Sequence, residues 1–284
     1  MLEAFDDIDR DWLMNSDRLD LQGKYVLVDF WAYSCINCIR GIPQIEEAYK
    51  LLYPKGFIAV GVHTPEFDFE KNPANVSNAI RRLGITYPVV LDQEYYLWAY
   101  FNNQFWPAHY LFDPTGELVF ESIGEEGTNE LLGVLNELFH VELPVLHTHK
   151  ADNDRTIPEL YLGRNRGELG NSPACKGSSC NVYTLPHRME SGKIYLNGIW
   201  ERHGQFVESL VEQCSIHLDY NGVDISGVFD SDVPRMINCS INGEITNLTI
   251  DGPSSYHIYD GGNTGGSLVL NVPKGVRVYT LTFG

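Results

Sequence analysis

Residues 25–45 read YVLVDFWAYSCINCIRGIPQI, a run that passes from a strand pattern into a helical pattern at two cysteines. The first seven residues are almost all apolar, which predicts a strand buried on both faces of a sheet. From Ile36 onward, apolar residues recur every three or four positions, at Ile39, Ile42, Ile45, Ala48, Tyr49 and Leu52. This spacing predicts a helix with one buried face, and it places Cys35 at the helix N-terminus.

The two cysteines of this run indicate thiol–disulfide chemistry. Unpaired backbone N–H groups and the positive end of the helix dipole favour a thiolate at Cys35, so we expect Cys35 to be the nucleophile. Cys38 lies about 5–6 Å away between Cβ atoms on the same helix, close enough to resolve a mixed disulfide, and we expect it to be more buried. Burial of Asp29 in the strand favours its neutral form, which suits a base for Cys38.

Other interpretations of these residues have to be weighed. A zinc site needs a second close pair of ligands, and the other close pair of cysteines, Cys175 and Cys180, lies far along the chain in a Gly- and Ser-rich segment. We therefore expect no metal. A purely structural disulfide at Cys35 and Cys38, or a core role for Asp29, remains an open alternative.

The sequence resembles two related families. The run Val28-Asp29-Phe30-Trp31-Ala32 before the cysteine pair resembles thioredoxin, with Pro43 at the kink of the helix and Asp29 at the buried acid. The segments 33–38, 61–67 and 106–111 resemble the DipZ family more closely. In that family a membrane electron carrier of the CcdA/DsbD kind is joined to a soluble TlpA-like thioredoxin domain and a carbohydrate-binding-module-like domain.

The resemblance has consequences for the site and its partners. It implies a cis peptide bond before Pro107, packed against the disulfide, with Trp106 and Trp31 beside the sulfurs as a substrate-binding surface. It implies protein disulfides as substrates, electrons from a membrane carrier of the CcdA/DsbD kind, as in cytochrome c biogenesis, and a redox-active disulfide in place of any other cofactor.

Composition limits the remaining classes of function. The 284 residues carry a net charge of −18 and a pI near 4.8, so we expect no nucleic-acid partner. No stretch approaches the roughly 20 apolar residues of a membrane span, and the acidic first residues are unlike a signal peptide. An even count of 6 cysteines favours an oxidising, extracytoplasmic location, periplasm or cell envelope, with any signal or membrane segment lying outside this sequence.

The first half of the chain alternates between strand and helix patterns. Strands are predicted at 57–63 and 87–92, helices at 75–83, 93–101 and 128–139, and a hairpin at 108–120. This alternation predicts an α/β, mostly parallel sheet, and the thioredoxin resemblance makes residues 1–145 a thioredoxin-like domain. Residues 146–156 are predicted to be a linker.

From residue 157 onward, short alternating strands and Asn-Gly or Gly-Gly turns predict an all-β sandwich of the jelly-roll type over 157–284. The resemblance to carbohydrate-binding modules raises the possibility of a glycan ligand, although fold alone does not establish one. Cys175 and Cys180 are expected to form a local disulfide, and Cys214 and Cys239 could pair across the sheet. Three pairings of these four cysteines remain open.

These observations predict a thiol–disulfide oxidoreductase that acts as a reductant, because Ile36 and Asn37 add no charge to stabilise the Cys35 thiolate further. A peroxiredoxin is disfavoured, since its single reactive cysteine would lie in a Pro- and Thr-rich loop. The alternative is a binding or adaptor protein whose β domain recognises a glycan or a protein, with a structural thioredoxin-like domain.

Overall fold

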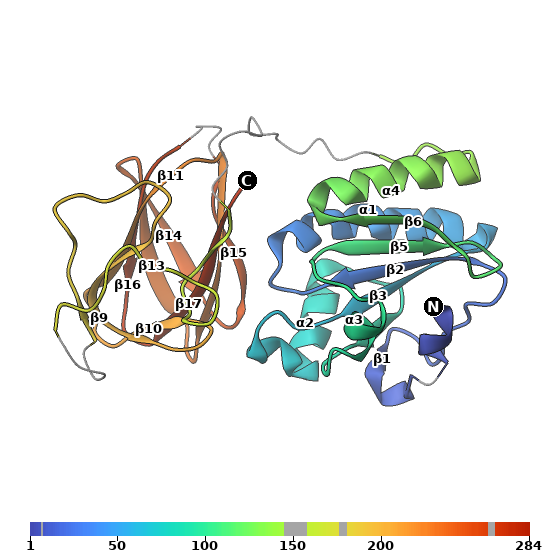
Figure 1. The fold of residues 1–284 in the computed structure, drawn as a ribbon, viewed down its shortest axis with the longest axis horizontal. Coiled ribbons are helices and arrows are strands. Elements are labelled where there is room, and N and C mark those ends of the chain that lie inside the picture. Colours follow the sequence, from blue (N-terminus) through green and yellow to red (C-terminus); the bar gives the residue numbers. More distant parts are fainter. Residues whose placement is uncertain (7, 145–157, 176–180, 261–264) are drawn as a thin grey trace. The chain divides into compact units, whose positions relative to one another are not determined.

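The computed structural model describes residues 1–6, 8–144, 158–175, 181–260 and 265–284. The chain divides into two compact units, Met1–His147 and Thr148–Gly284 (Figure 1). The linker predicted at 146–156 lies outside the described residues.

The first unit is built on a six-stranded sheet. Its order is β1 (Leu13–Met14), β4 (Val89–Leu91), β3 (Phe57–His63), β2 (Tyr25–Trp31), β5 (Ala108–Phe112) and β6 (Leu118–Ile123). Strands β2, β3 and β4 are parallel, whereas β1, β5 and β6 are each antiparallel to their neighbours. We predicted a mostly parallel sheet, but the parallel part is limited to β2, β3 and β4. These are the strands that alternate with helices along the chain.

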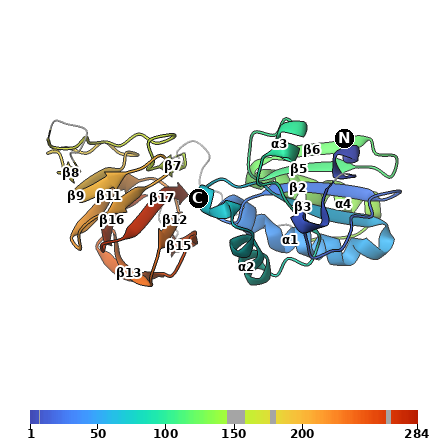
Figure 2. The same ribbon diagram turned by 90° about the horizontal axis from the view of Figure 1, so that it is seen from below.

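Helices cover both faces of this sheet (Figure 2). One face packs against α1 (Ile36–Leu52), α2 (Pro73–Leu83) and α4 (Gly124–Phe139), and the other packs against α3 (Tyr96–Tyr100) and the N-terminal turn η1 (Leu2–Phe5). Side chains of β2 alternate accordingly: Leu27 and Trp31 belong to the α1 face, and Val28 and Phe30 to the α3 face. Asp29 therefore projects toward the α1 face. Three further short turns are η2 (Arg10–Trp12), η3 (Tyr53–Lys55) and η4 (Asp68–Lys71).

The second unit is an antiparallel β domain whose strands surround one apolar core. Its strands are β7 (Leu160–Tyr161), β8 (Val182–Tyr183), β9 (Tyr195–Arg202), β10 (Val207–Ser209), β11 (Cys214–Tyr220), β12 (Asp224–Ser231), β13 (Arg235–Ile241), β14 (Glu244–Ile250), β15 (Ser254–Asp260), β16 (Gly266–Val272) and β17 (Val276–Phe283). Nine of them follow one another in the order β14-β13-β16-β11-β9-β10-β17-β12-β15, with β7 beside β17 and β8 beside β9. The path curls into a nearly closed, barrel-like sheet. Trp200 is wholly buried in its core, so it offers no surface for a ligand.

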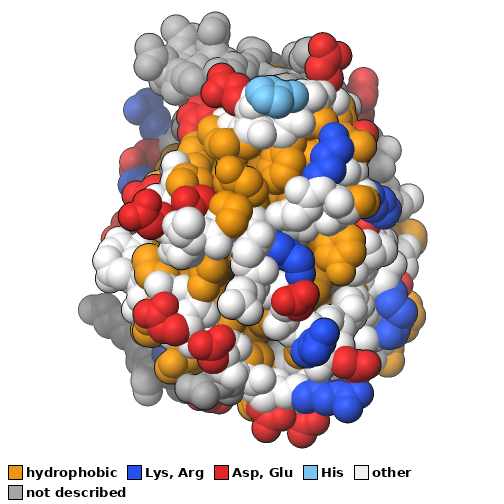
Figure 3. Space-filling model, turned by 90° about the vertical axis from the view of Figure 1, so that its right-hand side faces the viewer, with side chains coloured by type: hydrophobic (Ala, Val, Ile, Leu, Met, Phe, Trp, Pro, Cys, Tyr) orange, Lys and Arg blue, Asp and Glu red, His pale blue; other side chains and the backbone are white. Residues whose placement is uncertain are grey.

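Two surface properties bear on possible partners. Among the described residues, no helix combines the length and the apolar character that a membrane crossing requires. On the face that Figure 3 shows, described acidic and basic side chains are interspersed around an apolar area. That face therefore has no concentrated positive charge for a polyanion.

Candidate active site

Cys35 and Cys38 form a disulfide at the N-terminal end of α1, with Cα atoms 5.3 Å apart. Cys35 is the N-cap of the helix, and its sulfur accepts a hydrogen bond from the backbone N–H of Cys38 at 3.2 Å. Cys38 is 3% exposed, whereas Cys35 is partly exposed. The more exposed of the two sulfurs is therefore that of Cys35, and a helix N-terminus favours a thiolate over a thiol.

On the face of the sheet that α1 covers, Asp29 is part of a buried chain of polar side chains. Its Oδ1 lies 3.1 Å from Nδ1 of His109, and both side chains are 1% exposed. His109 is the residue directly opposite Asp29 in the β2–β5 pair. On its other side, Nε2 of His109 lies 3.0 Å from the hydroxyl of Thr128 in α4. The acid predicted from the strand pattern thus has an imidazole neighbour that the sequence analysis missed.

A glycine allows the helix that carries Thr128 to come close to α1. A Cβ atom added at Gly41 would lie 2.9 Å from Oγ1 of Thr128, nearer than ordinary packing permits. Position 41 therefore requires a residue without a side chain if Thr128 is to keep its contact with His109.

The loop before Cys35 is held by a buried carboxylate. Glu70 is 0% exposed and accepts hydrogen bonds from the backbone N–H groups of Ser34 at 2.9 Å, Glu66 at 2.6 Å and Phe67 at 3.1 Å. Burial raises the pKa of Glu70, and these backbone hydrogen bonds oppose the increase. Glu70 stands at the third position of the short helical turn η4, where a Glu side chain commonly accepts hydrogen bonds from backbone N–H groups at the start of the turn. This position in the sequence is the feature that could have indicated its role.

His63 supports the same loop from the end of β3. It is completely buried, and its Nε2 accepts a hydrogen bond from the backbone N–H of Tyr33 at 3.3 Å. Its ring stacks on Tyr33 and meets Trp31 edge-on at a centroid distance of 4.9 Å. Burial lowers the pKa of His63 to about 3, so the imidazole is neutral at physiological pH and serves as an acceptor.

On the other side of the disulfide, the peptide bond between Trp106 and Pro107 is cis, as the thioredoxin resemblance predicted. The indole N–H of Trp106 donates to the carbonyl oxygen of Thr64 at 3.1 Å, and its ring lies 4.2 Å from that of Trp98 between centroids. Trp106 is partly exposed and packs with Cys35 against the same core. Trp106 therefore presents a restrained, partly exposed aromatic ring.

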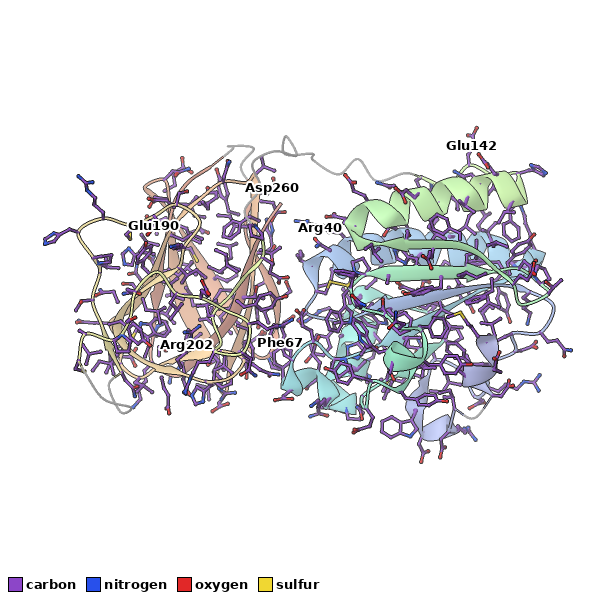
Figure 4. All side chains as sticks on the ribbon, in the orientation of Figure 1. Arg40, Phe67, Glu142, Glu190, Arg202 and Asp260 are labelled. Carbon is purple, nitrogen blue, oxygen red and sulfur yellow. A yellow bond between two sulfur atoms is a disulfide. The ribbon has the colours of Figure 1, made fainter. Side chains whose placement is uncertain are left out.

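Arg40 is the cation nearest to the cysteines in the sequence, and it lies at the same end of the first unit as the disulfide (Figure 4). One guanidinium nitrogen lies 3.2 Å from a carboxylate oxygen of Glu125 in α4. This ion pair joins α1 to α4 at the end of α1 that carries the disulfide, and Glu125 balances part of the Arg40 charge.

Two predictions about side chains need correction. Trp31 is 0% exposed and belongs to the core beneath the helix, so it does not line the docking surface that we expected it to share with Trp106. The indole packs inward because it lies on the α1 face of a central strand, between the sheet and the helix.

The second correction concerns the β domain. Cys214 and Cys239 are buried free cysteines, not the candidate cross-sheet disulfide. Strand β16 lies between their strands and pairs with both, which separates them by about 10 Å, beyond the reach of a disulfide. Cys180 lies outside the described residues, so the pairing proposed for Cys175 stays a prediction.

Comparisons with known proteins agree with the division of the chain into two units. Residues 14–121 match the AhpC/TSA family, and residues 157–284 match the family described as thioredoxin like C-terminal domain. The chain is 32% identical over 279 residues to protein DipZ of Mycobacterium bovis, a match that covers 94% of this chain and 40% of DipZ. It therefore spans less than half the length of this relative.

Two further proteins are similar to the first unit alone. Thiol-disulfide oxidoreductase YkuV of Bacillus subtilis is 32% identical over 108 residues, which cover 38% of this chain and 72% of YkuV. The solution structure of a thioredoxin-like protein in the oxidized form matches at 27% identity and a TM-score of 0.42, covering 48% of this chain and 93% of that one.

Proposed function

Because this chain belongs to the thioredoxin-like thiol–disulfide oxidoreductases, and is homologous to DipZ over 94% of its length, we propose that it reduces disulfide bonds of protein partners. The observation that carries the proposal is the placement of Cys35 as N-cap of α1, with Cys38 one turn inside the helix. An exposed nucleophile and a buried resolving thiol are thereby held within bonding distance of each other.

The reaction proceeds in two exchanges. The Cys35 thiolate attacks one sulfur of the partner disulfide, forming a mixed disulfide and releasing the other partner sulfur as a thiolate. Cys38 loses its proton and attacks Cys35, so that the Cys35–Cys38 disulfide forms and the second partner sulfur leaves. Two electrons have then passed from the dithiol to the partner.

Asp29 is the proposed acceptor of the Cys38 proton. It projects from β2 toward the face of the sheet that α1 covers, and Cys38 packs on that same face. Its 1% exposure keeps bulk water away from the carboxyl group, so the proton acceptor on this face is a protein side chain.

Trp106 and Pro107 are the proposed docking surface. In the thioredoxin family the backbone of the residue before the cis-proline pairs with the substrate chain, and the exposed part of the Trp106 ring is placed to cover such a chain. Trp98 and Thr64 restrain the ring, which lowers the entropy lost on binding.

Electron supply and location are proposed from the relationship to DipZ. The 60% of DipZ that has no counterpart here would include its membrane electron carrier of the CcdA/DsbD kind. We therefore propose that such a carrier, in the same or another chain, re-reduces the Cys35–Cys38 disulfide in an extracytoplasmic compartment, as in cytochrome c biogenesis. Residues 1–145 would form the redox domain and 157–284 the β domain.

Protein disulfide reduction with dithiothreitol as electron source tests this proposal. The full chain is expected to accelerate the reduction of insulin, and Cys35→Ser is expected to abolish the acceleration. Reduced Cys38→Ser, freed of dithiothreitol before it meets insulin, is expected to accumulate a mixed disulfide. Equal rates for the wild type and Cys35→Ser would contradict the proposal and favour the adaptor alternative.

A second candidate function is ligand binding by the β domain, and one feature of its surface supports it. Five neighbouring strands carry amide or hydroxyl side chains at directly opposite positions on the face away from the core: Asn247, Asn238, Asn271, Ser215 and Asn197. Hydrogen bonds join Asn238 to Asn247 at 3.1 Å and Asn271 to Asn238 at 3.2 Å. Such an uncharged row of donors and acceptors suits the hydroxyl groups of a glycan, which supports a carbohydrate-binding role for this domain.

Titration of the full chain with a panel of neutral oligosaccharides by calorimetry tests this role. We expect Asn238→Ala and Asn271→Ala each to weaken binding, because each removes one donor and one acceptor. An affinity that both variants leave unchanged would exclude the amide row as the ligand site.

A further inference from the structure

Asp29 and His109 meet inside the first unit, where solvent does not reach either of them. The contact of 3.1 Å joins β2 to β5, and the contact of 3.0 Å from His109 to Thr128 extends it to α4. One ring nitrogen of His109 therefore contacts the carboxyl of Asp29, and the other contacts the hydroxyl of Thr128.

The carboxylate of Asp29 depends on this neighbour. Among the described residues, neither of its oxygens has a well-aligned hydrogen bond, and the contact with His109 meets the distance of an ion pair without the alignment of a hydrogen bond. An isolated buried polar group is costly, and the imidazole at 3.1 Å is the polar side chain in contact with this carboxyl.

We propose that Asp29 and His109 act as one proton-accepting couple for Cys38, with His109 as a positioning residue that Thr128 orients. This inference rests on the proposed function, in which Asp29 is the base. To act as a base, the couple has to start the step without the proton that it takes from Cys38.

The proton and the electrons balance in each turnover. The proton leaves the Cys38 sulfur and is shared between the carboxylate and the imidazole. The Cys38 thiolate then forms its bond to Cys35, and the bond from Cys35 to the partner sulfur breaks. When a donor later reduces the Cys35–Cys38 disulfide, the couple returns the proton to Cys38. Two interacting groups titrate together, so the pH dependence belongs to the pair.

Other ionisable groups also pack on this side of the sheet. Burial raises the pKa of Tyr87 well above its usual value, with the Asp29 charge as a secondary cause. Burial lowers the pKa of His63 to about 3 and raises the pKa of Glu70. At Glu46, burial is outweighed by hydrogen bonds from Thr86 and Lys50, which lower the pKa. Arg40 and Glu125 form an ion pair at 3.2 Å. Because all these groups are present in every variant, the Asp29→Asn background separates the effect of the couple from theirs.

The test follows the resolving step alone. A mixed disulfide of Cys35 with glutathione is formed on the full chain at about pH 4, from the 2-pyridyl disulfide of glutathione, where Cys38 is protonated. The pH is then jumped to a series of higher values, and loss of the glutathione mass is followed after acid quenching. His109→Leu removes the imidazole, His109→Gln restores a polar group, and Thr128→Val removes only the orienting hydroxyl.

We expect His109→Leu to move the midpoint of the pH–rate profile upward by about one unit, which slows the step about tenfold at neutral pH. His109→Gln is expected to recover part of this loss, and Thr128→Val to show the same shift to a smaller extent. In an Asp29→Asn background His109→Leu should have no further effect. His187→Leu, at an exposed position in the β domain, is the matched control.

The outcomes distinguish a failure of the Asp29–His109 couple from a failure of Asp29 as the base. If Asp29→Asn slows resolution but His109→Leu leaves the midpoint in place, or slows the step equally at every pH, the inference is overturned and the proposed function stands. If Asp29→Asn resolves like the wild type, the proposed base is wrong as well. Should His109→Leu not fold, as judged by circular dichroism, the profile of Thr128→Val decides: an unshifted midpoint overturns the inference.

Discussion

The sulfur of Cys35 accepts a hydrogen bond from the backbone N–H of Cys38 at 3.2 Å, so the proposed nucleophile caps the helix that carries the proposed resolving thiol. A thiolate accepts such a bond better than a thiol does, and the helix terminus adds a positive partial charge. The capping contact thereby couples the reactivity of Cys35 to the integrity of the first turn of α1.

The first prediction concerns selective alkylation of the reduced protein. Iodoacetamide at neutral pH is expected to modify Cys35 at least tenfold faster than Cys38, which is 3% exposed. Peptide mass spectrometry over time measures both rates. Cys239 is an internal control, because burial raises the pKa of its thiol to about 11 and it should stay unmodified. Equal rates at Cys35 and Cys38 would refute the assigned roles.

The second prediction concerns Glu70. Replacing it with Gln places an amide NH₂ among three backbone N–H donors, so we expect the free energy of unfolding to fall by about 1–3 kcal/mol. Ser34 directly precedes Cys35, so losing the hydrogen bond that holds Ser34 should also slow insulin reduction. Urea unfolding of the full chain measures the first effect, and Glu47→Gln, at an exposed position on α1, is the matched control. A variant as stable as that control would show that the loop does not depend on Glu70.

The third prediction concerns pH and His63. Its pKa of about 3 in the folded chain lies below the value of 6.5 in an unfolded one, so the unfolded state binds more protons between these values. Stability from the neutral imidazole is therefore complete above pH 6.5 and is lost as the pH falls toward 3, by about 1.4 kcal/mol per unit.

His63→Gln should reduce the slope of unfolding free energy against pH by about that amount in this window. His187→Gln, which alters an exposed histidine, should keep the wild-type slope. Urea unfolding at several pH values compares the three proteins, and parallel curves for all of them would rule out a buried neutral His63.

The fourth prediction concerns docking. Trp106→Ala should lower kcat/KM for a protein disulfide about tenfold, and should change the rate with oxidised glutathione much less, because a small disulfide does not need the aromatic surface. Trp12→Ala removes an indole that is 38% exposed and should affect neither substrate. An equal loss for both substrates would mean that Trp106 supports the site structurally and does not bind the partner chain.

The strands next to the site were predictable because burial on both faces leaves a continuous apolar run. Residues 25–31 and 57–63 form β2 and β3 with the predicted ends. Helix α3 is shorter than its pattern, spanning Tyr96–Tyr100, because Tyr95 adopts a left-handed backbone conformation at φ 59° and Asp92 accepts the first helical N–H groups.

What the sequence did not reveal depends on pairing between distant segments. His109 interrupts the apolar strand Ala108–Phe112, but only the register of β5 against β2 places it opposite Asp29. The candidate bond between Cys214 and Cys239 failed for the same kind of reason, since strand order decides which cysteines are neighbours. Register and strand order are properties of the assembled sheet, which a single sequence does not specify locally.

The most direct test of the central claim is the reduction potential of the Cys35–Cys38 couple. It is measured on the full chain by equilibration in dithiothreitol or glutathione buffers and thiol alkylation, with the other four cysteines replaced. Because Ile36 and Asn37 bring no charge to the cysteine pair, we predict a value near the −270 mV typical of thioredoxin. A value near −120 mV would identify a disulfide-forming oxidant and contradict the proposed direction of electron flow, and the lack of a reversible couple would contradict the redox function itself.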